Sequence, residues 1–151
     1  RALIDAGFSL KIWGKNWDSS KEFTAYAKGW VKPGDELAKV YSGSKIVIGA
    51  FSHGTAHYRI WEATSCGALC MVRNVPPEYD HADIRDYLTP GEHFIFYDNE
   101  TDLVNKIRYY LEHETERMKI AANGRERIRE ILTYPVAVRK TFAFLQESYS
   151  I

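Results

Sequence analysis

Two short apolar runs, separated by a helix-like segment, constrain the fold of this chain more than any other feature. "KIVIGAF" (45–51) and "ALCMV" (68–72) are apolar at nearly every position, which is typical of strands covered on both faces. Between them, "AHYRIWEATSCG" (56–67) has a helical pattern that ends at Gly67. A strand, a helix and a strand in this order predict a parallel pair joined by a right-handed crossover.

The rest of the chain extends this alternation. Further strands are predicted at "FSLKIWG" (8–14), at the very short "KGWV" (28–31) and at "HFIFY" (93–97). Helical patterns begin at Asp35 and, after strand 93–97, occupy the remainder of the chain: 100–114 with Asn99 as its cap, 115–132, and 135–149 with Pro135 as its first residue. We therefore predict an α/β, Rossmann-like fold with a mostly parallel sheet, helices on both faces and a helical C-terminus, all in one domain (1–151).

Charge and cysteine usage exclude several classes of function. Lysine plus arginine number 20 and aspartate plus glutamate also number 20, so the balance favours neither a nucleic-acid binder nor a membrane-surface binder. No apolar stretch approaches the roughly 20 residues of a membrane-spanning helix. The two cysteines, Cys66 and Cys70, make no disulfide framework and indicate a reducing setting, so we expect a cytoplasmic protein. They can be packing residues or a pair of metal ligands. Gly67 between them favours packing residues, because it indicates that one cysteine ends a helix and the other enters a strand.

Ligands of an open parallel sheet bind beyond the carboxyl ends of its strands. Three segments meet this condition, namely "GKNW" (14–17), "SHGT" (52–55) and "VRNVPPEYD" (72–80). The helix that we expect to start near Thr55 follows a loop whose free N–H groups, together with the helix dipole, would attract an anion such as phosphate.

Arg59, Glu62 and Cys66 share one face of that helix at spacings of three and four. A carboxylate at Glu62, pointing along the ligand edge, would accept hydrogen bonds from two neighbouring hydroxyls such as those of a ribose. Alternatively, Arg59 and Glu62 form a surface ion pair worth a few tenths of a kcal/mol. His53 and His57 have the spacing H-x3-H, which fits a zinc site only with a third ligand; a polar loop residue or a phosphate neighbour is the other interpretation.

Three longer segments occur in the order found in one enzyme family. They are "GWVKPGDELAKVYSGSKIVIGAF" (29–51), "RIWEATSCGALCMV" (59–72) and "YLTPGEHFIFYDNETDLVNKIRYYLEHETERMKIAANGRERI" (87–128). Together they resemble the C-terminal, nucleotide-sugar-binding half of GT-B glycosyltransferases, in the "glycosyl transferases group 1" subgroup that includes the CgeB-like spore maturation proteins. The resemblance implies a nucleotide-sugar donor as substrate, no other cofactor and no metal.

The resemblance also implies which residues bind the donor. Glu62 matches the glutamate that binds the ribose hydroxyls, and Arg59 matches an arginine that contacts either the donor phosphate or the acceptor. The remaining matches are the loop whose backbone contacts the base, Gly29, Trp30 and Val31, and the loop facing the diphosphate and sugar, Ser52, His53, Gly54 and Thr55. No catalytic residue can be assigned.

The chain also departs from the family. Retaining members carry another glutamate, eight residues before the one that Glu62 matches. In this sequence Gly54 stands at that position. The family's sheet begins one strand earlier than Arg1, after an N-terminal acceptor domain. We therefore expect a donor-binding fragment of a two-domain, hexosyltransferase-like enzyme, which alone binds nucleotide weakly and catalyses nothing. The alternatives are a non-catalytic nucleotide-binding or interaction module, and a receiver- or flavodoxin-like domain, whose acidic cluster or hydroxyl-rich loop this sequence lacks.

Overall fold

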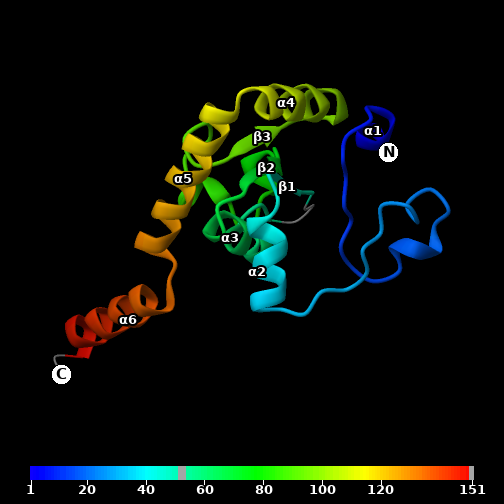
Figure 1. Ribbon diagram of the computed structural model, residues 1–151. Helices are drawn as coiled ribbons and strands as arrows, with labels where there is room; N and C mark the ends of the chain where they lie inside the picture. The colour runs from blue at the N-terminus through cyan, green and yellow to red at the C-terminus, as the bar shows by residue number, and fades with distance from the viewer. Residues whose placement is uncertain (51–53, 150–151) are drawn as a thin grey trace.

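The fold is built on three parallel strands in the order of the sequence (Figure 1). The computed structural model describes residues 1–50 and 54–149. The strands are β1 (Ile46–Gly49), β2 (Leu69–Arg73) and β3 (Ile95–Tyr97), with β2 in the middle. Ile46 lies opposite Leu69, and Met71 opposite Ile95. The predicted parallel sheet is confirmed.

The described part of the chain contains six α-helices, of which α1 and α2 precede β1, α3 connects β1 to β2, and α4, α5 and α6 follow β3. They are α1 (Ala2–Asp5), α2 (Asp35–Ser42), α3 (Tyr58–Ser65), α4 (Glu100–Glu112), α5 (Glu114–Ile131) and α6 (Tyr134–Tyr149). The predicted cap of α4 is confirmed, because the Asn99 side chain accepts a hydrogen bond from the amide of Asp102. Gly67 follows α3 with a φ of +85°, a conformation that glycine adopts without strain.

Helices cover both faces of the sheet. Successive residues of the central strand point to opposite faces, so each face has its own hydrophobic cluster. Cys70 and Val72 of β2 face one hydrophobic cluster, and Leu69 and Met71 face the other. The first cluster also contains Ile60, Ala63, Phe94 and Ile128, from α3, the segment before β3 and the C-terminal half of α5. The second contains Leu103, Ile107, Ile120 and Ala121, from α4 and the N-terminal half of α5. This arrangement confirms a Rossmann-like fold with helices on both faces.

The two cysteines differ in environment. Cys66 is half-buried at the C-cap of α3, and Cys70 is 1% exposed in β2. The Cys70 sulfur accepts a hydrogen bond from Thr64 Oγ1 at 3.2 Å, and burial raises the pKa of its thiol to about 12. Their positions agree with a sequence pattern that ends a helix at the first cysteine and enters a strand at the second.

This difference predicts selective thiol chemistry. With a disulfide reagent at pH 8, we expect the folded chain to react at Cys66 alone, because Cys70 remains a buried thiol well below its pKa. In denaturant, both thiols should react. Stopped-flow absorbance with a Cys66→Ser variant measures this directly, and rapid modification of that variant without denaturant would contradict the burial of Cys70.

The N-terminal segment does not form the strands that its sequence predicts. In place of strands 8–14 and 28–31, one isolated bridge joins Ile12 and Ala27, and the blue segment between α1 and α2 swings away from the sheet in Figure 1. Ile46, Val47 and Ile48 are half-buried rather than covered on both faces, because β1 pairs only with β2 among the described residues. A short apolar run becomes a strand only where a neighbouring strand accepts its hydrogen bonds.

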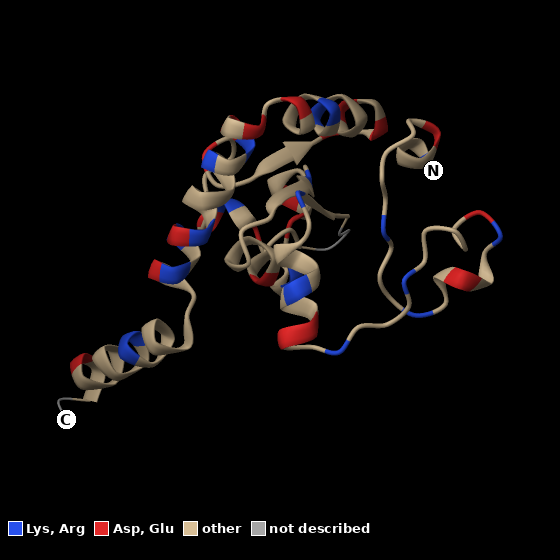
Figure 2. Cartoon of the chain, viewed as in Figure 1, with Lys and Arg blue, Asp and Glu red and all other residues tan. Residues whose placement is uncertain are grey.

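The last helix begins at Tyr134, one residue before the predicted start, and projects from the end of α5 (Figure 1). Its predicted apolar stripe faces solvent, with Val138 52%, Phe142 63% and Tyr149 67% exposed, and no residue of α6 is buried. Figure 2 shows that α6 carries few charges, whereas acidic and basic residues alternate along α4 and α5. Among the described helices, none combines the length and apolar character needed to cross a membrane.

Candidate functional site

The carboxyl edge of the sheet is held together by contacts between the ends of its strands. The Tyr97 hydroxyl, at the end of β3, donates to the carbonyl of Gly49 at the end of β1, with an oxygen–oxygen distance of 3.3 Å. After β2, the amide of Asn74 donates to the Tyr97 carbonyl at 2.8 Å, and its side chain donates to Asp98 at 2.7 Å. This is the edge at which open parallel sheets bind ligands.

Helix α3 begins at this edge, at Tyr58 and not at Thr55 as the sequence predicts. His57 is its N-cap, and His57 Nδ1 accepts a hydrogen bond from the amide of Arg59 at 3.3 Å. Burial, and then the charge of Arg59, lower the pKa of His57, so at neutral pH Nδ1 keeps the lone pair that the cap requires. The cap fixes the direction in which the first turn of α3 leaves the sheet.

Glu62 and Arg59 are exposed on the first two turns of α3, while Ile60 and Ala63 are buried beneath them. Burial raises the pKa of Tyr41, on α2, to about 12, with a further contribution from the negative charge of Glu62 and an opposing one from Arg59. Both charges therefore lie close to the α2–α3 contact. Within the described part of the chain, neither belongs to an ion pair; the Arg59 guanidinium lies 5.6 Å from the centre of the Tyr58 ring. The predicted alternative, an Arg59–Glu62 pair, is not formed.

Thr55 is fully buried, which corrects the expectation of a loop with free N–H groups at this residue. The amide of Thr55 donates to Asp80 Oδ1 at 2.9 Å, and its hydroxyl donates to Asp80 Oδ2. The next amide, of Ala56, donates to the carbonyl of Ala82 at 2.7 Å. These two amides are therefore occupied by the connection that follows β2. Sequence reasoning misses Asp80, because an aspartate in a long polar connection carries no local sign of burial.

The remaining predicted residues are only partly brought together. Gly54 directly precedes Thr55, with a φ of +156°. Ser52 and His53 lie outside the described residues. Residues 29–31 lie in the segment that swings away from the sheet, with Trp30 60% exposed, so this segment does not lie beside α3 (Figure 1). Among the described residues, no group of three histidine, cysteine or acidic side chains is arranged to hold a metal.

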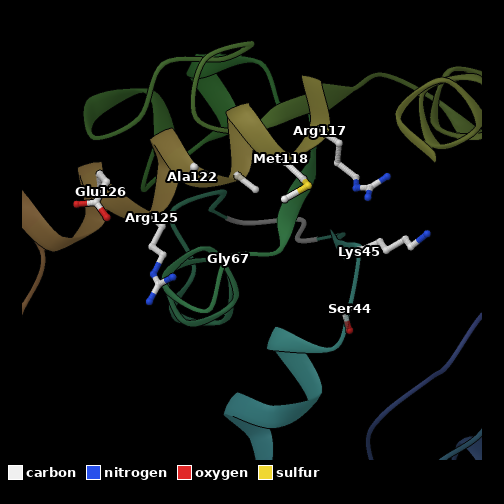
Figure 3. A pocket seen from close by; sticks show the side chains of 9 residues that line it. Ser44, Lys45, Gly67, Arg117, Met118, Ala122, Arg125 and Glu126 are labelled. Carbon is white, nitrogen blue, oxygen red and sulfur yellow. The ribbon is translucent and has the colours of Figure 1, made fainter. Parts of the chain in front are cut away.

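A shallow cavity of about 310 Å³ lies at the opposite, amino edge of the sheet (Figure 3). Its lining residues include Ser44 and Lys45, which precede β1, and Gly67, which precedes β2. Arg117 and Arg125 of α5 also line it, but Arg117 already donates to the Tyr110 carbonyl and to Glu114. None of the predicted site residues that the structure describes lines this cavity, which lies at the edge opposite to the candidate site.

A family model described as "Glycosyl transferase-like" matches residues 1–141. No curated protein matches the chain. Several solved structures share its fold. A glycosyltransferase from Rickettsia africae ESF-5 has a TM-score of 0.70 at 15% identity, over 97% of this chain and 43% of that one. Anabaena HepE in complex with UDP-glucose has a TM-score of 0.70 at 16% identity, over 97% of this chain and 44% of that one.

Sucrose-phosphate synthase from Thermosynechococcus elongatus has a TM-score of 0.67 at 15% identity, over 89% of this chain and 33% of that one. The chain therefore spans less than half the length of each of these structures. At such low identities, the likeness establishes the fold. Since the family model covers nearly the whole sequence, this chain belongs to the glycosyl transferase-like family.

Proposed function

We propose that this chain is the donor-binding domain of a GT-B glycosyltransferase that transfers a sugar, of hexose type, from a nucleoside diphosphate to an acceptor. The observation that carries the proposal is the exposed carboxylate of Glu62 on a helix that starts at the carboxyl edge of a parallel sheet, in a member of this family. A carboxylate with two oxygens suits a vicinal diol, which presents two hydroxyl donors side by side. Anabaena HepE, which shares the fold, has been solved in complex with UDP-glucose, and this supports a donor of the same class here.

In this proposal, Glu62 binds the ribose and Arg59 binds either the diphosphate or the acceptor. The segment around Gly54, with Ser52 and His53 before it, faces the diphosphate and sugar. The backbone of Gly29, Trp30 and Val31 contacts the base, which requires that segment to lie closer to α3 than it does in Figure 1. Thr55 fixes the position of the segment around Gly54, since its amide and hydroxyl donate hydrogen bonds to Asp80.

No metal or cofactor is required by this proposal. The positive end of α3 and the Arg59 guanidinium would stabilise the negative charge that develops on a leaving diphosphate. A general base, where the reaction uses one, would come from an acceptor-binding domain outside this chain. We therefore expect the isolated chain to bind nucleotide weakly and to catalyse no transfer.

The exposed apolar face of α6 supports the existence of such a partner domain. Val138, Phe142 and Tyr149 present a stripe that soluble helices normally bury. We propose that this stripe contacts the remainder of a longer, cytoplasmic protein, in which the two free thiols of this chain remain reduced.

Ligand-dependent melting tests the proposal. We expect one of UDP, GDP and ADP, or its glucose conjugate, to raise the melting temperature, because a ligand at 100 times its dissociation constant adds about 2.7 kcal/mol to the free energy of unfolding. Uridine without phosphate and inorganic pyrophosphate are the controls for base and phosphate alone.

The second candidate is a non-catalytic nucleotide-binding or interaction module. It is favoured by Gly54, which stands where retaining family members carry a glutamate. A complete panel without any thermal shift would reject the donor-binding domain in favour of an interaction module.

A further inference from the structure

Two loops that leave the carboxyl edge of the sheet are tied together by one buried carboxylate. The Asp80 side chain has no exposed surface, and Thr55 is 0% exposed. Asp80 Oδ1 accepts from the amide of Thr55 at 2.9 Å and from the amide of Ala82 at 3.4 Å, while Oδ2 accepts from the Thr55 hydroxyl. Both oxygens are therefore used within the protein.

Thr55 completes the link by accepting as well as donating. Its hydroxyl oxygen accepts a hydrogen bond from the amide of Ile84 at 2.9 Å, and the amide of Ala56 donates to the carbonyl of Ala82 at 2.7 Å. Thr55 and Ala56 are thus both bonded to the segment 80–84, although the two segments lie about 25 residues apart in the sequence. We call these contacts the Asp80 latch.

Arg85 contacts the Asp80 side chain of the latch. Arg85 Nη2 lies 3.9 Å from Asp80 Oδ2 and donates to the Val75 carbonyl at 2.8 Å. The Arg85 guanidinium lies 5.2 Å from the centre of the Phe96 ring, on β3. The latch therefore connects the segment before α3 to the connection that follows β2 and, through Arg85 and Phe96, to β3.

From these contacts we propose that Asp80 is a positioning residue for the donor site, acting through Thr55. Only two residues separate Thr55 from Tyr58, the first residue of α3. The first two turns of this helix carry Arg59 and Glu62. A buried carboxylate that ties two loops is weak evidence for stability, because removing it from water opposes the gain from its bonds. Its effect is to fix one geometry of the loop that leads into α3. This role rests on the proposed donor-binding function.

The variants separate positioning from general stability. Asp80→Asn replaces one acceptor oxygen with an NH₂ group, so one of the two Thr55 donors loses its partner. Thr55→Val removes the hydroxyl while it keeps the size of the side chain, and Thr55→Ser retains the hydroxyl. Ile120→Val and Ile120→Ala are the controls, because Ile120 is buried in the cluster on the other face of the sheet and the two substitutions bracket a range of stability losses.

The first measurement is amide hydrogen exchange of the full chain without ligand. We expect the amides of Thr55, Ala56 and Ile84 to exchange at least tenfold faster in Asp80→Asn and Thr55→Val, and to remain protected in Thr55→Ser and in the Ile120 variants. Unchanged protection in both latch variants would show that the latch does not hold this segment.

The second measurement is the dissociation constant of the nucleoside diphosphate that stabilises the wild-type chain, by calorimetry at a temperature where every variant is folded. We expect at least a tenfold weaker affinity for Asp80→Asn and Thr55→Val, within threefold of wild type for Thr55→Ser, and within twofold for the Ile120 variants. If the latch variants bind as wild type does, or lose no more affinity than an Ile120 variant of equal stability, Asp80 has no positioning role. If the wild-type chain binds no nucleoside diphosphate, the proposed function is wrong and the positioning role is rejected with it.

Discussion

Gly124→Ala is expected to destabilise the chain by up to about 2 kcal/mol, although alanine is the better helix former. A methyl group at Gly124, on α5, would lie 2.5 Å from the carbonyl oxygen of His93 and 2.9 Å from Cγ2 of Thr64. The first neighbour is backbone and the second is a core side chain, so neither can yield without moving the segment before β3 or α3. Helix propensity favours alanine by about 1 kcal/mol. Overpacking of a filled core costs about 1–3 kcal/mol and sometimes more, so it outweighs the gain in propensity here.

Urea denaturation followed by circular dichroism measures this effect. Ala122→Gly is the matched control, because Ala122 is exposed two residues earlier on the same helix and reports helix propensity alone, about 1 kcal/mol in the opposite sense of substitution. Gly124→Val should cost more than Gly124→Ala. A more stable Gly124→Ala would mean that α5 does not approach His93 as closely as the structure shows.

The Gly124 contact illustrates what a sequence pattern can and cannot predict. The helical pattern places Ala121, Gly124, Ile128 and Ile131 on one face; the first three are buried and Ile131 is half-buried. The pattern does not show what that face contacts. Only the structure shows that α5 crosses the carbonyl of His93 at a glycine, because the partner is about 30 residues away in the chain.

The same distinction applies to the strands. Runs such as "ALCMV" are recognised because a fully covered strand is apolar on both faces, and β2 is the central strand. "FSLKIWG" (8–14) has a similar composition but no neighbouring strand among the described residues beyond the bridge at Ile12. Local composition therefore predicts the tendency to form a strand, and the presence of a partner decides the outcome.

For helix starts and for the candidate site, too, the sequence predicts features that depend on local residues and misses those that depend on a distant partner. Asn99 is predictable as a cap because asparagine caps through its own side chain, whereas His57 caps α3 only as a neutral imidazole with a free Nδ1 lone pair. Helical spacing places Arg59 and Glu62 on one face of α3, and both side chains are exposed in the structure. The Thr55–Asp80 contact has no local signal, since neither residue type is usually buried.

Glu62→Gln is expected to weaken the binding of the stabilising nucleoside diphosphate about 10- to 100-fold and to leave the free energy of unfolding within about 0.5 kcal/mol of wild type. Hydrogen bonds to a charged acceptor contribute about 1.5–3 kcal/mol, and tenfold in affinity is about 1.4 kcal/mol. Glutamine keeps the size of the side chain but offers one acceptor oxygen and one NH₂ donor, so it cannot accept from both hydroxyls of a diol. The small effect on folding follows from the exposure of Glu62.

Glu130→Gln is the matched control, because Glu130 is an exposed glutamate on α5 whose contact is a surface ion pair with Arg127. It removes the same charge away from the candidate site and should change the dissociation constant less than twofold.

A comparison with the 2′-deoxynucleotide assigns the effect to the ribose. The wild-type chain should lose affinity when the 2′-hydroxyl is absent, and Glu62→Gln should lose little more, because the two changes remove the same interaction and their free energies are then not additive. Calorimetry of both proteins with both nucleotides completes the cycle. If Glu62→Gln keeps the full penalty for the deoxynucleotide, the carboxylate does not contact the diol, and the ribose-binding role of Glu62 is wrong even where nucleotide binding itself is observed.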